Sequence, residues 1–229
     1  MTGRPDGQDN WLPRKRESIT MTEESLMFES GGITLEGRFS SGEGRRGAVI
    51  THPHSLMGGN MTNNVVEALT AVFRDRGFTT LRFNFRGVGR SGGIFDNGEG
   101  EQNDVLGALS FLMEREATGI ILAGYSFGAW VNGKLADRGE MFSNIVMVSP
   151  PIDILEFSRD FPAKTGDLVI CGDHDQFCPL DRLTELAERS GCPVKIVSGA
   201  DHFYTGYEAA LAKHLADYLD TGVPKDGMT

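Results

Sequence analysis

The chain has little cysteine, no long apolar run and fewer basic than acidic residues. It carries three cysteines, an odd number whose spacing matches no zinc-binding pattern, so neither a disulfide framework nor a zinc site is expected. No apolar stretch approaches the roughly 20 residues that a membrane-spanning helix needs, and the N-terminus lacks the apolar core of a secretion signal. These absences predict a cytoplasmic protein that does not enter a membrane.

The formal net charge is −10, which disfavours nucleic acid as a partner because phosphate binding requires a basic surface. The 229 residues, of which 39% are hydrophobic, suffice for one sizeable core. We therefore expect a single domain over residues 23–221. Residues 1–22 are polar and predict a disordered tail, and residues 222–229 predict a frayed C-terminus.

Strand-like and helix-like patterns alternate along the predicted domain, after an opening hairpin at Gly31-Gly32. Strands are expected at Ser25–Ser30, Ile33–Ser40, Gly47–Thr51, Phe78–Phe85, Ile120–Ala123, Ile145–Ser149, Asp167–Cys171 and Val194–Val197. Helices are expected at Asn60–Arg76, Asn103–Glu116, Ala129–Asp137, Pro179–Ser190 and Tyr204–Leu219. This order predicts an α/β fold, with a mostly parallel sheet of about eight strands and helices on both faces.

One short motif points to chemistry. Gly124-Tyr125-Ser126-Phe127-Gly128 follows the strand at 120–123 and precedes a helix. A strand, a G-x-S-x-G turn and a helix in this order are typical of a nucleophile elbow, in which a serine hydroxyl stands clear of a sharp turn. The alternative is an ordinary Gly/Ser turn between a strand and a helix.

A serine nucleophile needs a base, and the base needs a carboxylate to hold its tautomer. His202 follows the last predicted strand and is the candidate base; His214 fits packing better. Asp175 follows the strand at 167–171 and is the candidate acid, with Asp173 as the alternative. The order serine, aspartate, histidine differs from the chymotrypsin and subtilisin arrangements.

These motifs, from about Ser25 to Leu219, resemble the α/β-hydrolase superfamily. The chain is similar to its small bacterial members that have no cap domain and carry an H-P-H-P-x-x-G-G segment. That segment is His52-Pro53-His54-Ser55-Leu56-Met57-Gly58-Gly59 here, with Ser55 in place of the second proline. The family pattern G-x-x-D followed by x-x-x-P favours Asp175 over Asp173. Dienelactone hydrolases are related in size, but they usually carry cysteine at the elbow, where this chain has Ser126.

The resemblance implies no cofactor, no metal and an oxyanion hole made of backbone N–H groups. Phe127 is expected to give one N–H, and the segment after the third strand the other, from His54, Ser55 or Leu56. His52 and His54 lack a third metal ligand, so a metal site is disfavoured. Leu56, Met57, Phe95 and Phe177 are candidate substrate-binding side chains or ordinary loop packing.

Other functions fit the sequence less well. Gly87-x-Gly89-x-x-Gly92 matches a dinucleotide fingerprint in form, but the glycines that follow prevent a helix from starting at once. A non-catalytic binding protein would be expected to have lost a member of the triad. The hypothesis is a cytoplasmic serine carboxylesterase for small or short-chain acyl esters, with a thioesterase or a small peptidase-like hydrolase as alternatives. A homodimer is compatible with it.

Overall fold

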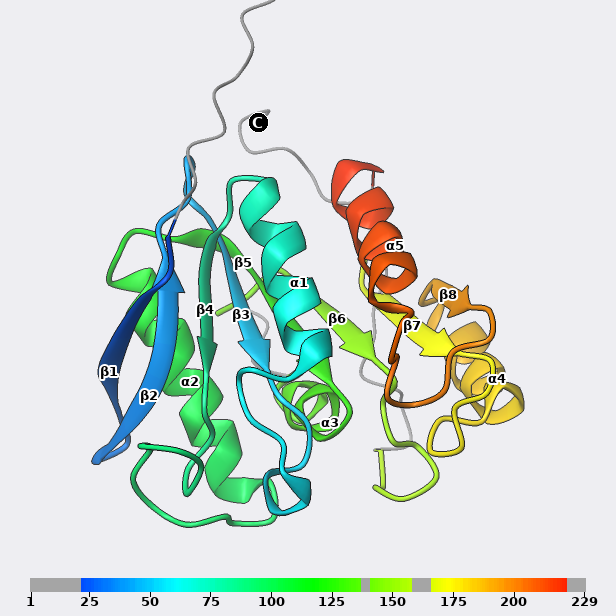
Figure 1. The fold of residues 1–229 in the computed structure, drawn as a ribbon, viewed down its shortest axis with the longest axis horizontal. Coiled ribbons are helices and arrows are strands. Elements are labelled where there is room, and N and C mark those ends of the chain that lie inside the picture. The colour runs from blue at the N-terminus through cyan, green and yellow to red at the C-terminus, as the bar shows by residue number, and fades with distance from the viewer. Residues whose placement is uncertain (1–21, 137–140, 158–165, 222–229) are drawn as a thin grey trace, which may run out of the picture.

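The computed structural model describes residues 22–136, 141–157 and 166–221, which form one eight-stranded sheet flanked by helices (Figure 1). Apart from Thr22, the predicted tails at 1–22 and 222–229 lie outside these residues. Within the described ranges, no helix combines the length and the apolar character needed to cross a membrane.

The sheet has the order β1-β2-β4-β3-β5-β6-β7-β8. Strand β2 runs antiparallel to β1 and β4, and the pairs from β4 to β8 are parallel. The predicted opening hairpin is confirmed, and every predicted strand is present with ends within two residues of those expected. The strands are β1 (Glu24–Ser30), β2 (Ile33–Ser40), β3 (Arg46–Thr51), β4 (Thr79–Phe83), β5 (Thr118–Tyr125), β6 (Asn144–Val148), β7 (Leu168–Gly172) and β8 (Val194–Val197).

Helices cover both faces of the sheet, as predicted. They are the short 3₁₀ helix η1 (Ser55–Met57), α1 (Asn64–Asp75), α2 (Glu99–Met113), α3 (Phe127–Gly133), α4 (Leu180–Ser190) and α5 (Glu208–Thr221). Helices α1 and α5 pack on one face, whereas α2, α3 and α4 pack on the other (Figure 1). Strand β3 serves both cores, because Ala48 and Ile50 face α1 and α5 while Val49 faces the opposite side.

Three helices begin four residues from their predicted starts, whereas α3 and α4 begin within two residues of theirs. Helix α1 begins at Asn64 rather than Asn60, because the Asn63 side chain caps it by accepting from the Val65 N–H (2.9 Å). Helix α2 begins at Glu99 rather than Asn103, because the buried Glu101 carboxylate accepts from the turn before it, including the Gly98 N–H (2.8 Å).

The start of α5 and the end of α3 also differ from the predicted bounds. Tyr204 has φ 56°, outside the helical range, so α5 begins only at Glu208. Helix α3 ends at Gly133, and the predicted end at Asp137 lies outside the described residues.

The segment between β6 and β7 carries no cap helix in its described parts, 149–157 and 166–167. Residues 149–157 form turns that stay close to the sheet. The Asp153 N–H donates to the Phe177 carbonyl (3.3 Å), and the Trp130 Nε1–H donates to the Glu156 carbonyl (3.0 Å). These bonds draw the segment beside the end of β7 and over α3.

A buried arginine links the first strands to the loop that follows β3. Arg82 on β4 is 4% exposed and makes a two-pronged ion pair with Glu23 (2.8 and 2.6 Å). Its Nη1 also donates to Glu67 on α1 (3.0 Å) and to the Met61 carbonyl (2.8 Å). The Met61 N–H donates to the Asn84 side chain (2.8 Å), so hydrogen bonds hold both the N–H and the carbonyl of Met61.

We predict that Arg82→Met lowers the free energy of unfolding by about 3 kcal/mol, because it leaves the Glu23 carboxylate without its partner in a nearly buried place. Lys213→Met, which breaks the exposed Lys213–Asp217 pair, is the matched control and should change stability by less than about 1 kcal/mol. Urea denaturation followed by circular dichroism measures both. Equal small losses would mean that the Arg82 network stabilises nothing.

Candidate active site

The G-x-S-x-G turn joins β5 to α3 at the carboxyl edge of the sheet. Ser126 adopts φ 54° and ψ −116°, a conformation that L-residues rarely occupy and that costs about 1–3 kcal/mol. The Ser126 N–H donates to the Val148 carbonyl at the end of β6 (2.9 Å). The surrounding strands therefore hold the serine in the strained geometry expected of a nucleophile elbow.

The two glycines of the turn are required by close backbone approach. A Cβ at Gly124 would lie 2.6 Å from the Ala129 nitrogen and from the Gly128 backbone. A Cβ at Gly128 would lie 2.6 Å from Thr51 Oγ1 and 2.8 Å from the His52 carbonyl. Any side chain at these positions would push α3 away from β3 and β5, so the elbow depends on glycine.

The structure brings Ser126, His202 and Asp175 together in one hydrogen-bonded chain. His202 Nε2 lies 2.9 Å from Ser126 Oγ, and His202 Nδ1 lies 2.9 Å from both carboxylate oxygens of Asp175. All three residues are buried, with 8% or less of each exposed. The three arrive from the loops after β5, β7 and β8, as the sequence predicts.

The surroundings of Asp175 keep it ionised. Its Oδ1 accepts from the backbone N–H groups of Phe177 (2.9 Å) and Cys178 (3.1 Å). Burial raises the pKa of the carboxyl, but hydrogen bonds from His202, Ser149 and the Phe177 N–H outweigh burial, so the pKa lies below its usual value. A carboxylate of this kind can orient an imidazole and stabilise its protonated form.

Three residues that the sequence did not predict support the hydrogen-bonded triad. The Tyr125 hydroxyl donates to the His202 carbonyl (2.7 Å), and the hydroxyls of Ser149 and Tyr204 share a hydrogen bond (2.8 Å) beside the acid. Tyr125 stands at the first variable position of the G-x-S-x-G motif, so the motif could have indicated a residue beside the serine. The contacts of Ser149 and Tyr204 depend on the packing of segments far apart in the chain.

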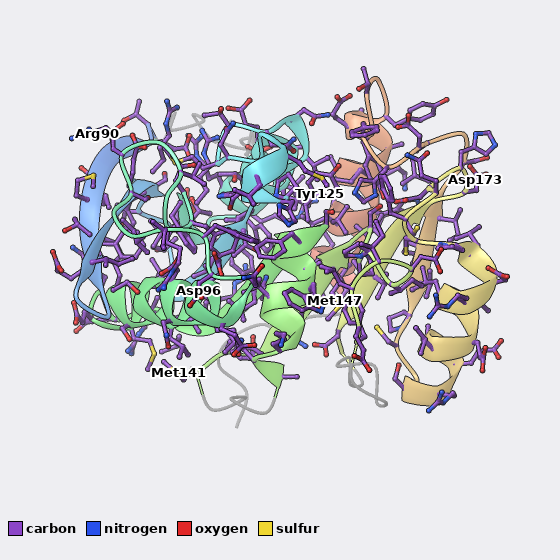
Figure 2. The ribbon with its side chains drawn as sticks, turned by 90° about the horizontal axis from the view of Figure 1, so that it is seen from below. Arg90, Asp96, Tyr125, Met141, Met147 and Asp173 are labelled. Atoms are coloured by element: carbon purple, nitrogen blue, oxygen red, sulfur yellow. The ribbon has the colours of Figure 1, made fainter. Side chains whose placement is uncertain are left out.

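Asp173, the alternative acid, has a different role. Its carboxylate accepts from the Gly199 N–H (2.6 Å) and from the Ser198 hydroxyl (3.1 Å). The bond from Gly199 is the main cause that lowers the pKa of Asp173. Viewed toward the carboxyl edge (Figure 2), Asp173 lies near the outer end of the sheet, whereas Tyr125 lies near its middle. Asp173 ties the loop after β8 to the loop after β7 and does not contact His202.

The N–H groups expected to bind an oxyanion differ in availability. Among the described residues, the amides of Phe127, His54 and Ser55 donate to no protein acceptor. The Leu56 N–H donates to His54 Nδ1 (3.2 Å), so Leu56 is the least available of the three candidates in the loop. His54 and Ser55 are left as the candidates for the second donor.

His52 is a structural histidine with both ring nitrogens in use. The Phe85 N–H donates to Nε2 (3.0 Å), so the proton sits on Nδ1, which donates to the Pro53 carbonyl (2.6 Å). Burial lowers the pKa of His52 to about 4, although the bond to Pro53 opposes this. With its nitrogens committed, His52 offers no metal ligand. Within the described ranges, no three His, Cys, Asp or Glu side chains converge as a metal site would require.

The predicted substrate-binding side chains fall into two groups. The Phe177 ring stands edge-on to His202 (4.7 Å between centroids), and the Phe95 ring lies 5.7 Å from Phe127. Leu56 and Met57, by contrast, are 72% and 84% exposed. Phe177 therefore contacts the histidine of the triad and Phe95 packs against the residue after the serine, whereas Leu56 and Met57 project into solvent.

The glycine-rich loop after β4 does not have the shape of a dinucleotide site. The Gly87 N–H donates to the Gly92 carbonyl (3.0 Å), which closes the loop on itself, and α2 begins only at Glu99. Arg86 is paired with the fully buried Asp104 (2.8 Å). This loop packs beside the elbow through Phe95, and no helix begins at Gly87, Gly89 or Gly92.

Known proteins similar to this chain match it over most of its length. No protein-family model matches it. An uncharacterized protein of Rickettsia prowazekii is 35% identical over 210 residues, which cover 86% of this chain and 88% of that protein. An α/β serine hydrolase homologue of Coxiella burnetii is 32% identical with a TM-score of 0.79, over 88% of this chain and all of that one. A lidless α/β serine hydrolase of Xanthomonas campestris is 28% identical with a TM-score of 0.81, over 90% and 97% of the two chains.

The buried His52 predicts a loss of stability in acid. Its pKa is about 4 in the folded protein and 6.5 in the unfolded chain, so the unfolded state binds more protons between these values. The free energy of unfolding should therefore fall by about 3 kcal/mol from this group as the pH drops from 7 to 4. Urea denaturation at several pH values measures the fall.

His52→Leu should be less stable at pH 7 by about 1–3 kcal/mol, because the Phe85 N–H loses its acceptor, and should lack this portion of the acid dependence. His174→Asn, at an exposed position, is the control and should keep it. An unchanged acid dependence in His52→Leu would contradict the assignment.

Proposed function

This chain belongs to the α/β serine hydrolase family, and we propose that it is a serine carboxylesterase that cleaves small or short-chain acyl esters through an acyl-enzyme intermediate. The observation that carries the proposal is the continuous hydrogen-bonded chain Ser126–His202–Asp175 at the end of β5. A non-catalytic binding protein would not need all three groups in hydrogen-bond contact.

In the first half of the reaction, Ser126 Oγ attacks the ester carbonyl carbon while its proton passes to His202 Nε2. The carbonyl oxygen takes the electron pair of the broken π bond. It is then held by the Phe127 N–H and by an N–H of the loop after β3, from His54 or Ser55. Asp175 stabilises the imidazolium through Nδ1–H. Collapse of the tetrahedral intermediate expels the alcohol oxygen, which takes the proton from Nε2.

In the second half, water attacks the acyl group on Ser126 and gives a proton to His202 Nε2. The second tetrahedral intermediate uses the same N–H donors. When it collapses, Ser126 Oγ takes the proton back and the carboxylic acid leaves.

Two features support a small ester over a peptide as the substrate. The described part of the segment between β6 and β7 adds no helical domain that would select a peptide, and Phe95 and Phe177 are apolar candidates for contact with a short acyl chain. The three cysteines are free thiols, which agrees with a cytoplasmic location. The homodimer stays a prediction.

Ser126→Ala should abolish labelling by a fluorophosphonate probe and lower kcat on p-nitrophenyl acetate by about 10⁴- to 10⁶-fold. Labelling is read on a gel, and a p-nitrophenyl series from acetate to decanoate should show preference for the short chains. Labelling without ester turnover would indicate a thioester substrate instead. Full ester turnover by Ser126→Ala would contradict the proposal.

Asp175→Asn should lower kcat about 10⁴-fold with little change in KM, because the amide favours the wrong tautomer of His202. Asp173→Asn is the matched control. It weakens a bond between two loops outside the triad and should change kcat by less than about tenfold. A larger loss in Asp173→Asn would exchange the roles of the two acids.

A further inference from the structure

His54 organises the loop between β3 and α1 from both its backbone and its side chain. Its carbonyl accepts from the N–H groups of Met57 (3.0 Å) and Gly59 (3.1 Å), which closes the turn of η1. Its side chain caps the same turn, since Nδ1 accepts from the Leu56 N–H (3.2 Å). The direction of the N–H groups in this loop therefore depends on His54.

The His54 ring also joins this loop to the elbow. Its centroid lies 4.9 Å from that of Phe127 and 4.9 Å from that of Phe95. Phe127 follows the proposed nucleophile and carries one of the two proposed oxyanion donors. The ring thus packs against one donor residue while its nitrogen fixes the loop that supplies the other.

The bond to Leu56 requires a neutral imidazole. Nδ1 accepts a hydrogen bond only while it carries no proton, and in the imidazolium both ring nitrogens are donors. Protonation would place an N–H of His54 against the Leu56 N–H and break the cap. We propose that His54 is a positioning residue whose neutral ring aligns the oxyanion-binding loop, so that its protonation slows acyl transfer in acid. This inference rests on the proposed function.

The charged groups around His54 leave the neutral form in place near pH 7. Burial lowers the pKa of His54, and the carboxylate of Glu101 on α2 opposes it. Glu101 is itself occupied by the N–H groups of Asp96 and Gly98 (2.9 and 2.8 Å). On the neighbouring loop, Arg86 faces Asp104 (2.8 Å) and Asp96 (4.0 Å).

The elbow helix places no charged group against the His54 ring. From α3 the ring meets the uncharged Phe127. His202, paired with Asp175, is the other imidazole of the site. The acid limb of the pH profile should therefore be steeper in the wild type than in a variant whose residue 54 takes up no proton.

The test compares His54→Asn with His54→Ala. The Asn side-chain oxygen can cap the turn by accepting from the Leu56 N–H but takes up no proton in this range. His54→Ala removes the cap and should lower kcat/KM about 10- to 100-fold, mostly through kcat, and His54→Asn should recover most of that loss. As the pH falls below the pKa of His54, log kcat/KM should fall more steeply in the wild type than in His54→Asn.

The rate of fluorophosphonate labelling between pH 4.5 and 8 gives the same information without a natural substrate, with circular dichroism to verify folding at each pH. His214→Asn, an identical change on α5 outside the site, should keep the wild-type slope. A wild-type slope retained in His54→Asn, or no rescue of His54→Ala by Asn, would overturn the proposal.

A failure of the proposed function is distinguished by nuclear magnetic resonance on Ser126→Ala, which needs no catalysis. The Leu56 amide resonance should titrate together with the His54 ring and lose that titration in His54→Asn. If the probe does not label Ser126 in the wild type but the two resonances titrate together, the esterase proposal fails. The dependence of the Leu56 hydrogen bond on neutral His54 is then still supported. If the Leu56 amide resonance does not change as His54 ionises, the proposed role of His54 is wrong, whether or not the protein is an esterase.

Discussion

The strained turn at Ser126 is the constraint on which the rest of the site depends. Left alone, a serine with φ 54° would relax, so the turn persists only because the surrounding structure fixes it. The bond from the Ser126 N–H to Val148 ties it to β6, and Gly128 lets α3 lie directly against Thr51 at the end of β3. The three central parallel strands, each buried on both faces, therefore supply the rigidity that a reactive hydroxyl requires.

A buried carboxylate is the second constraint, and the loop after β7 is shaped to satisfy it. Leaving water raises the energy of an ionised Asp175, which the N–H groups of Phe177 and Cys178 and the imidazole of His202 offset. Asp173 accepts a hydrogen bond from Gly199 in the loop after β8, so both aspartates act on the loop that carries His202. One positions the loop that carries the histidine, and the other holds the ring.

Sequence reasoning located the elbow and, through the family resemblance, the other two members of the triad, but it missed the contacts around them that depend on packing. The elbow could be predicted because a strand, two glycines and a helix lie within about a dozen residues. The start of α2 could not, because it is set by the Glu101 side chain reaching back to Gly98. Nor could the bond between Ser149 and Tyr204, which joins residues 55 apart in the chain. The Leu56 N–H shows the same limit, since only the structure reveals that His54 occupies it.

Three histidines near the serine differ in function because their neighbours differ. His52 is locked as one neutral tautomer by a donor on one side and an acceptor on the other, so its proton is unavailable at neutral pH. His202 has a carboxylate at Nδ1 and a hydroxyl at Nε2, which lets it take up a proton and return it. His54 accepts one backbone N–H and packs against two aromatic rings, so protonation costs it that bond, a loss that the charge of Glu101 opposes without preventing it. The partner of each nitrogen, more than the residue type, decides whether an imidazole supports the fold, transfers a proton or responds to pH.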